Sequence, residues 1–284
     1  MTSQWRDRLG QFGIWRPATL ATPELAQHLE QLGFGALWLG SSPAGELAIV
    51  DELLGATTSL IVGTSIVNIW KDNAATVAAS YQRIEAAYPG RFVLGAGAGH
   101  PEATAEYASP YEKLAGYVAM LIEHHVPADG IVLAALGPRV LRLAADRTGG
   151  AIPYLVPAEH THDARELLGP DRLLAPEHKV VLDPDPERAR ALGRPRVTNP
   201  YLHLVNYTSN LRRLGFTDTD IADGGSDRLI DALVAHGTPE QVAAGLRAHL
   251  DAGADHVCAQ LLTDAAADPL AGYTELARGL GLTS

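Results

Sequence analysis

A single α/β domain folded as a (β/α)8 barrel, the TIM-barrel architecture, is what the sequence predicts. Short apolar runs rich in Val, Ile and Leu alternate with longer segments whose apolar residues have helical spacing. Eight such strand–helix units follow one another along the chain. The chain has 284 residues, a length at which one barrel domain is common. We therefore expect residues 1–284 to form one domain.

Composition and charge narrow the class of protein. Hydrophobic residues make up 46% of the chain and charged residues 19%, as in a globular protein. The net charge of -11 argues against nucleic acid or an anionic membrane as a partner, because both need a basic face. With no apolar leader after MTSQWRDRLG, a cytoplasmic enzyme with a small-molecule substrate is expected.

Cysteine and histidine give no sign of a disulfide framework or a metal site. Cys258 is the single cysteine, in a run that indicates a buried strand. The 11 histidines show no HExxH spacing, and no paired CxxC pattern accompanies them. We therefore predict no metal site and interpret the histidines as scattered surface residues.

The first two units are marked by their boundaries. Thr22 is a suitable N-cap, Pro23 a suitable first helical residue, and Gly33 a suitable end for the first long helix. The predicted elements are a strand at 11–15, a helix at 23–32, a strand at 36–39 and a helix at 45–58.

The third unit, SLIVGTSIVNIWKDNAA, is the most informative stretch. Ser59–Val67 is predicted to be one buried strand, because it is short, apolar and rich in β-branched residues. It runs into Asn68, Ile69 and Trp70, and Asp72 or Asn73 then caps a helix at 74–88. The loop between strand and helix therefore carries polar and aromatic side chains.

The remaining units follow the same pattern. The predicted elements are strand 91–96, helix 111–124, strand 131–135, helix 138–146, strand 151–156, helix 159–168, a strand within 172–182 and a strand at 256–262. The segment 183–254 is too long for one crossover, so it is predicted to hold an insertion between strands seven and eight.

The active site of such a barrel lies at the carboxyl ends of its strands. Residues expected there are small, aromatic or polar, with no pair of carboxylates, so hydrolysis by paired acids and a magnesium site are poorly supported. Small residues between aromatic walls suit a flat ring and its phosphate. The glycines of GAGAGHP lack the third glycine and immediate helix of a dinucleotide fingerprint, because His100 and Pro101 follow. They form either a tight turn or a bare backbone that a cofactor approaches.

Four segments in order resemble the bacterial luciferase-like superfamily, and within it the coenzyme F420-dependent oxidoreductases. They are GTSIV with DNAATVA, RFVLGAGAGHP, LAALGPRVLRLAADRTGGAIPYLV and TPEQVAAGLRAHLDAGADHV. The resemblance implies a TIM barrel, a deazaflavin (F420) or FMN at the carboxyl ends of the strands, and a homodimer.

The resemblance also implies a set of cofactor-binding residues. A non-prolyl cis peptide behind the cofactor ring falls between Ser65 and Ile66. The helix that begins at Pro138 offers its amino end to a phosphate, with the amides of Arg139 and Val140 left free and Arg139 either adding charge or pointing to solvent. The full predicted cofactor set is Ser41, Ser65, Ile66, Gly97, Ala98, Gly99, Ala135, Leu136, Gly137, Pro138 and Arg139.

The catalytic residues depart from the family pattern. Where sugar-phosphate dehydrogenases of the family have an Asp-His pair after the second strand, this chain has Ser41-Ser42, and His100 replaces an acidic residue after the fourth. We predict His100 as the proton-transfer residue, with Ser42 and Trp70 beside it. His100 binding a phosphate or capping its loop is the alternative. An FMN-dependent monooxygenase or a non-catalytic binding protein are the other functional interpretations.

The acidic tail of a deazaflavin requires local positive charge on this acidic chain. Arg16, Lys71, Arg139 and Arg142 are the residues expected to supply it.

Overall fold

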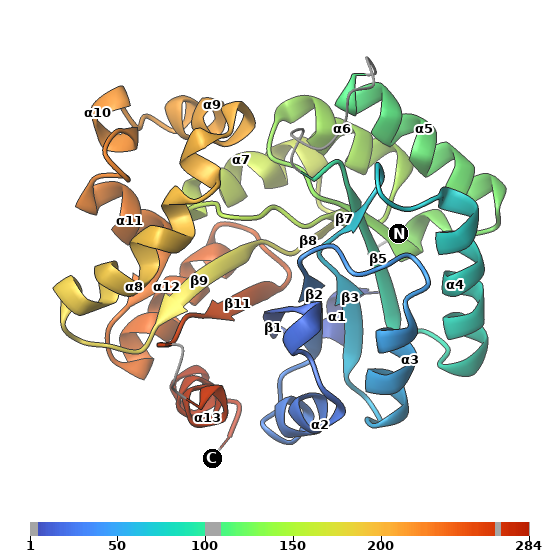
Figure 1. Ribbon diagram of the computed structural model, residues 1–284, viewed down its shortest axis with the longest axis horizontal. Helices are drawn as coiled ribbons and strands as arrows, with labels where there is room; N and C mark the ends of the chain where they lie inside the picture. The colour runs from blue at the N-terminus through green and yellow to red at the C-terminus, as the bar shows by residue number, and fades with distance from the viewer. Residues whose placement is uncertain (1–4, 100–108, 265–267, 284) are drawn as a thin grey trace.

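The computed structural model describes residues 5–99, 109–264 and 268–283. Helices surround a curved parallel sheet (Figure 1). The strands are β1 (Phe12–Pro17), β2 (Ala36–Gly40), β3 (Ile61–Thr64), β4 (Val67–Asn68), β5 (Phe92–Gly97), β6 (Ile131–Leu133), β7 (Gly150–Ala151), β8 (Leu173–Leu174), β9 (Glu177–Val181), β10 (Val234–His236) and β11 (Val257–Leu261). The α-helices are α1 (Trp5–Leu9), α2 (Pro23–Gln31), α3 (Ala48–Gly55), α4 (Ala74–Ala87), α5 (Pro110–Glu123), α6 (Pro138–Arg147), α7 (Ala158–Leu168), α8 (Pro186–Thr198), α9 (Val205–Arg213), α10 (Asp218–Ile221), α11 (Asp227–Leu233), α12 (Pro239–Asp251) and α13 (Pro269–Leu280).

The sheet closes through one continuous segment, residues 173–181. Its amino end pairs with β7, and Ala175 and Glu177 extend that ladder by donating to the carbonyls of Ala151 and Pro153 at 3.0 and 2.8 Å. Its carboxyl end pairs with β11, which pairs with β1. Within the described residues the ring is therefore β1, β2, β3–β4, β5, β6, β7, β8–β9 and β11, and the predicted TIM-like α/β fold is confirmed.

The predicted single strand Ser59–Val67 is wrong in one respect, because it is interrupted. β3 ends at Thr64, the Ser65–Ile66 peptide is cis, and β4 resumes at Val67 beside β5. Thr64 bridges the gap. Its hydroxyl donates to the Gly95 carbonyl at 2.8 Å and accepts from the Gly95 amide at 2.8 Å. One side chain thus satisfies both backbone groups that the missing ladder would have paired.

Trp15 and Trp38 fill the barrel beneath its carboxyl-terminal mouth. A Cβ on Gly63 would lie 2.3 Å from the Trp38 ring, and one on Gly40 would lie 1.8 Å from the Trp15 ring. Each indole thus packs directly on a glycine of a neighbouring strand. The Trp38 indole donates to Nε2 of His256 at 3.0 Å, which satisfies the buried N–H. The mouth of the barrel consequently rests on a packed floor.

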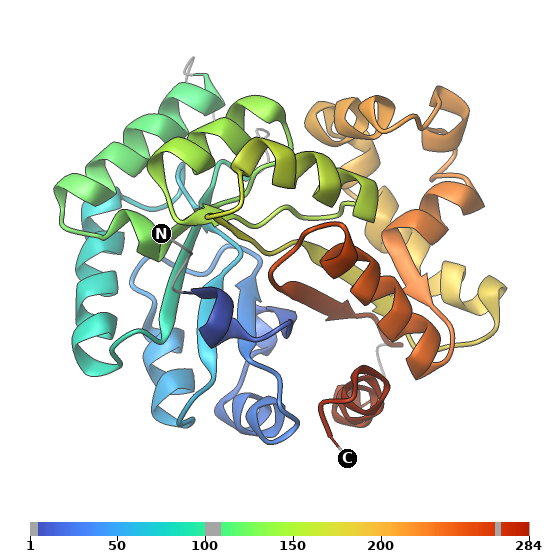
Figure 2. The same ribbon diagram turned by 180° about the vertical axis from the view of Figure 1, so that it is seen from behind.

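Helices α8 to α11 form a group at one side of the barrel in both views (Figures 1 and 2). Their apolar side chains form a second hydrophobic cluster, which also contains barrel residues of β9 and β10 and is distinct from the main core between sheet and outer helices. Leu202, Leu211, Ile221 and Leu229 are members of it. Within this part of the chain, the short 3-10 helix η4 (Tyr201–His203) and α9 are the elements that reach the barrel mouth.

The interpretation of the histidines as surface residues is wrong for His160, His178, His249 and His256, which are buried. The Thr161 hydroxyl lies 2.7 Å from Nδ1 of His249, and Nε2 of His249 lies 3.0 Å from Nδ1 of His178. Nδ1 of His178 also lies 3.3 Å from the Val156 carbonyl, which can only accept. With both rings neutral, His178 therefore donates to Val156 and His249, and His249 donates to Thr161. Burial lowers the pKa of His178 to about 4 and that of His249 to about 2.

This buried chain of hydrogen bonds predicts acid sensitivity. A depressed folded-state pKa means that the unfolded chain binds protons more readily below its own pKa of about 6.5. The stabilisation is complete above that pH and is lost as the pH falls toward the folded-state pKa. We expect the free energy of unfolding to drop between about pH 6.5 and 5, by roughly 1 kcal/mol per pH unit for each neutral buried histidine. Urea unfolding at a series of pH values measures the slope.

The matched variants are His249→Gln and His162→Gln, because the side chain of His162 is 66% exposed. The first should reduce the slope by the share of one histidine, because the pKa values of His160, His178 and His256 are lowered by burial as well, and the second should leave it unchanged. An unchanged slope in His249→Gln would show that this pair does not cause the acid sensitivity.

Candidate functional site

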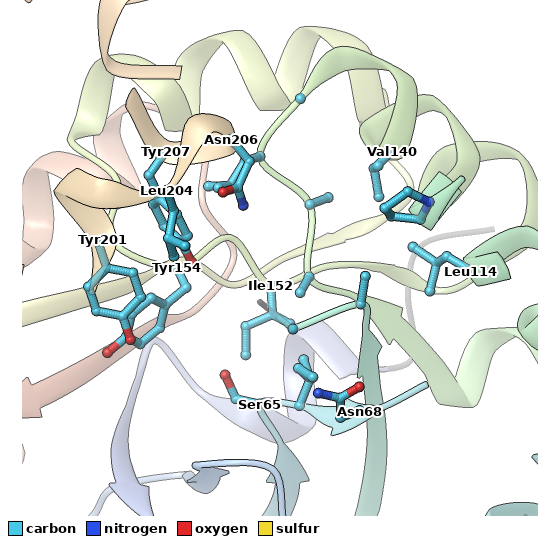
Figure 3. Close-up of a pocket in the computed structure, with 18 of the residues that line it drawn as sticks. Ser65, Asn68, Leu114, Val140, Ile152, Tyr154, Tyr201, Leu204, Asn206 and Tyr207 are labelled. Carbon is cyan, nitrogen blue, oxygen red and sulfur yellow. The ribbon is translucent and has the colours of Figure 1, made fainter. Parts of the chain in front are cut away.

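A cavity of about 920 Å³ opens at the carboxyl ends of the barrel strands. Its volume is in the range of ligand-binding pockets. Figure 3 shows its wall: Ser65 and Asn68 at the base, Leu114 and Val140 on one side, and Tyr154 and Tyr201 on the other. The described lining residues are Trp15, Ser41, Ser42, Ser65, Ile66, Asn68, Trp70, Ala98, Gly99, Pro110, Tyr111, Leu114, Ala134, Ala135, Leu136, Gly137, Val140, Ile152, Tyr154, Pro200, Tyr201, His203, Leu204, Val205, Asn206, Tyr207 and Ser209.

Most of the predicted site residues lie together in this wall. Those that line the cavity are Ser41, Ser42, Ser65, Ile66, Trp70, Ala98, Gly99, Ala135, Leu136 and Gly137. Three others, Gly97, Pro138 and Arg139, lie just outside the lining. His100 lies outside the described residues, so its role stays a prediction.

The loop after β2 reaches the cavity through an unusual backbone. Ser41 and Ser42 have φ values of 61° and 51°, both in the left-handed region that non-glycine residues rarely adopt. The Lys71 ammonium donates to the Ser42 carbonyl at 3.1 Å and so ties this loop to the β4–α4 loop. Both serines are thereby held in the cavity lining.

Glycines let the wall approach closely on either side of Ala98. At Gly97 there is no room for a side chain between two lining residues, since a Cβ there would lie 2.8 Å from the Ala134 Cβ and 3.1 Å from Ile66. Gly99 has φ +60°, and a Cβ there would lie 2.5 Å from Nδ2 of Asn68. The Asn68 side chain is fixed because its Oδ1 accepts from the Trp70 amide at 2.9 Å. The Gly99 loop is therefore a bare backbone surface against a fixed amide.

The amino end of α6 lies at the same wall, and the segment just before it is held by two side-chain hydrogen bonds. The Leu136 carbonyl accepts from Nε2 of buried His160 at 2.9 Å and from Arg213 at 3.4 Å. Burial lowers the pKa of His160, which keeps its ring neutral. The Val140 amide, predicted to be free, donates to the Gly137 carbonyl at 3.1 Å. This correction leaves Arg139 as the first-turn amide that faces outward.

Among the described residues, four exposed or half-buried cations contact the cavity lining, and the buried Lys179 lies against Tyr154, although the chain is acidic overall. Lys71 meets Ser42 at 3.1 Å, Lys113 lies 5.6 Å from the Trp70 ring centroid, Arg139 lies 4.2 Å from the Tyr111 centroid, and Arg213 meets Leu136 at 3.4 Å. Lys71 and Arg139 are residues expected there. Of the other two expected, Arg16 instead donates to the Tyr273 hydroxyl at 3.3 Å, and Arg142 is exposed one turn along α6.

The opposite wall rests on a buried charged pair that the sequence analysis missed. Lys179 donates to Glu177 and to Gln260, both at 3.1 Å, and its ammonium lies 4.1 Å from the Tyr154 ring centroid. The Tyr154 hydroxyl donates to Gln260 at 2.9 Å. Burial raises the pKa of Glu177 and lowers that of Lys179, while the partner's charge opposes each shift.

A sequence signal for this pair was present in EHKVV. Glu177, His178 and Lys179 alternate in a strand, so Glu177 and Lys179 point to one face and His178 to the other. Charged residues on the inward face of a barrel strand indicate either a buried ion pair or a site. The aromatic residues of η4 and α9 gave no comparable signal, because their approach to the mouth depends on the fold of α8–α11.

Residues 16–121 match a known family, described as Luciferase-like monooxygenase. The predicted resemblance to the luciferase-like superfamily is thereby confirmed over these residues. No curated protein matches the chain.

Solved structures extend the likeness in fold to nearly the whole chain. An F420-dependent secondary alcohol dehydrogenase in complex with an F420-acetone adduct has a TM-score of 0.72 at 16% identity, over 96% of this chain and 98% of that chain. The coenzyme F420-dependent tetrahydromethanopterin reductase of Methanopyrus kandleri gives 0.69 at 13% identity, over 95% and 98%. The oxygenating constituent of 3,6-diketocamphane monooxygenase from Pseudomonas putida, in complex with FMN, gives 0.66 at 15%, over 94% and 96%. Enzymes of this luciferase-like kind, both oxidoreductases and monooxygenases, share the fold.

Two further structural results concern membrane insertion and metal binding. Within residues 5–99, 109–264 and 268–283, no helix has the length and apolarity needed to cross a membrane. Over the same ranges, no group of three or more His, Cys, Asp or Glu side chains is arranged to hold a metal ion.

The geometry at Gly99 predicts the effect of a side chain there. Gly99→Val should abolish ligand binding in the cavity, because the branched side chain would displace Asn68 and cover the bare backbone. The fold should survive with a modest loss of stability. Binding of F420 and FMN by equilibrium dialysis, with thermal unfolding in parallel, checks both expectations.

Gly281→Val is the control, because Gly281 has φ +73° and open space within 4 Å of the position that a Cβ would take. It carries the same left-handed strain without the clash, so it should lose stability alone. Unchanged ligand affinity in Gly99→Val would mean that this loop is only a turn.

Proposed function

We propose that the protein is an F420-dependent oxidoreductase that passes a hydride between the deazaflavin and a small organic substrate. The observation that supports this most is the group of cations, Lys71, Lys113, Arg139 and Arg213, around the cavity of an acidic chain. A deazaflavin carries a phosphate and an acidic tail, and cations at the rim attract both. Solved F420-dependent enzymes of the same fold support the choice of cofactor.

The residues of the wall fit such a cofactor. The outward-facing Arg139 amide and the positive end of the α6 dipole suit a phosphate, with the side chains of Arg139 and Arg213 nearby. The bare backbone at Gly99 permits close approach of a ribityl chain. When bound, the deazaflavin supplies a carbon that accepts or donates a hydride. The protein would orient it against Ser65, Ile66 and Asn68 and exclude water with its aromatic walls.

An FMN-dependent monooxygenase is the second candidate, favoured by the FMN-bound neighbour from Pseudomonas putida. It would need a separate reductase to supply reduced FMN. FMN carries a phosphate but no acidic tail, so it would use the α6 end and leave the outer cations without a partner. A protein that binds a ligand without catalysis is the third interpretation.

Equilibrium binding of F420 and FMN to the purified protein tests the choice of cofactor. We expect F420 to bind more tightly, with an affinity that falls as salt is added, because exposed charges are screened. Arg139→Gln should weaken F420 binding by about three- to tenfold, the effect of losing one exposed charge contact. The control is Arg142→Gln on the same helix, which should change it by less than about twofold.

The outcomes separate the three interpretations. Tight FMN binding with no response to F420 would overturn the proposed cofactor in favour of the monooxygenase. Binding of neither cofactor would favour the non-catalytic protein. Equal losses in Arg139→Gln and Arg142→Gln would show that net charge, and not a contact at the cavity, governs affinity.

His100 is the predicted proton-transfer residue, and its replacement tests catalysis. General acid–base assistance contributes about 10²–10⁴-fold, so His100→Ala should lower turnover by about that factor while F420 binding changes far less. His100→Asn keeps a hydrogen bond but cannot titrate, so it should restore little turnover. His203, which lines the cavity from η4, provides the matched variant His203→Ala. Normal turnover in His100→Ala with a loss in His203→Ala would move the role to η4.

A further inference from the structure

The cavity has a second side that the proposed cofactor contacts do not use. Tyr154, Tyr201, Leu204 and Tyr207 lie together on this side, away from Leu114 and Val140 (Figure 3). The Tyr154 and Tyr201 rings lie 5.3 Å apart, and the Tyr201 and Tyr207 rings 4.8 Å apart. We call Tyr154, Tyr201, Leu204 and Tyr207 the tyrosine wall. Its residues come from the segment after β7 and from η4 and α9. A ligand that rests on the base of the cavity therefore lies beside this wall.

Two of the three tyrosines in the tyrosine wall, Tyr154 and Tyr201, turn their hydroxyls away from the cavity. The Tyr154 hydroxyl donates to Gln260 inside the barrel, and the hydroxyls of Tyr154 and Tyr201 are hydrogen-bonded to each other. In Figure 3 both hydroxyls lie on the side of their rings away from Ile152. Ring carbons are therefore what Tyr154 and Tyr201 present to a ligand.

The cation behind this wall, Lys179, is neutralised and covered. It is 1% exposed, is paired with Glu177 at 3.1 Å, and lies against the Tyr154 ring. Burial raises the pKa of both Tyr154 and Tyr201, so their phenols remain uncharged at neutral pH. The described lining residues of the whole cavity include no Asp, Glu, Lys or Arg. A charged group placed against the wall would lose its water and gain no partner there.

The mouth on this side is apolar as well. Val205 lines it and is 79% exposed, which is unusual for a large aliphatic residue. The polar neighbours at the mouth, His203 and Asn206, are exposed and stay in contact with water. A ligand therefore passes an apolar edge before it reaches the rings.

We propose that the tyrosine wall is the substrate compartment and that it selects an uncharged, ring-bearing apolar substrate against carboxylate or phosphate analogues of the same shape. The inference rests on the proposed function, which gives the other side of the cavity to the cofactor. Aromatic faces bind hydrocarbon rings by area and stacking, whereas an unpaired anion bears its full desolvation cost.

A pair of probes with nearly the same shape and different charge tests this. Cyclohexyl methyl ketone and cyclohexanecarboxylate differ by a methyl group in place of a carboxylate oxygen. Isothermal titration calorimetry at neutral pH, with the full chain and both with and without saturating F420, should show the ketone binding at least about tenfold more tightly. Equal or tighter binding of the carboxylate, or binding of neither probe, would overturn the proposal.

Variants of Tyr201 locate the binding. Tyr201→Ala should weaken ketone binding by about tenfold through lost ring contact, and Tyr201→Phe should stay within about twofold of the parent protein. The control Tyr88→Ala removes a ring at the end of α4, outside the cavity, and should leave ketone affinity unchanged. A tenfold loss in Tyr201→Phe would mean that the hydroxyl meets the ligand, which contradicts an apolar compartment.

Failure of the proposed function has a different result. If F420 does not bind but the ketone still binds more tightly than the carboxylate in its absence, the cofactor is wrong and the compartment stands. If F420 binds and the carboxylate is preferred, the compartment is wrong and the function stands.

Discussion

The two hydrogen bonds between the Thr64 hydroxyl and Gly95 are the interaction on which the cavity depends. A closed barrel cannot interrupt a strand without leaving backbone groups unpaired in its interior. Thr64 is fully buried and supplies one donor and one acceptor at the point where β3 stops. Only glycine fits opposite, since a Cβ on Gly95 would lie 1.8 Å from the Thr64 carbonyl oxygen. The chain from Ser65 to Asn68 can therefore leave the ladder and become the base of the cavity.

Charge is distributed in the site by depth. At the rim the cations lie on exposed or half-buried side chains and stay hydrated, so they act at long range and cost little. Deeper, the only full charges that approach the described wall belong to Glu177 and Lys179, which neutralise each other behind an aromatic ring. Between these two zones the described lining is neutral. An acidic chain can in this way present a positive entrance and an apolar interior in one cavity.

Local patterns predicted most of the barrel and much of one wall. Thr22, Pro23 and Gly33 marked a helix where the structure has one, and the residues after β2, β4, β5 and β6 meet because parallel strands share their carboxyl edge. Contacts set by distant segments could not be predicted. Arg213 reaches Leu136 across 77 positions, and His249 reaches His178 across 71. Neither contact is reflected in the hydrophobic periodicity of the sequence, and neither are the hydrogen bonds of the Thr64 hydroxyl.

The second hydrophobic cluster, which joins α8–α11 to the barrel, has a consequence for how such proteins diversify. One face of the cavity is carried by η4 and α9, whose cluster is anchored on the barrel at β9 and β10, while the opposite face is carried by the barrel strands themselves. Changes at the exposed lining residues His203, Val205 and Asn206 can thus alter ligand choice without disturbing that cluster. Exchange of these exposed residues is therefore a more practical route to new specificity than a graft of the whole segment 200–213, whose buried residues pack with β9 and β10.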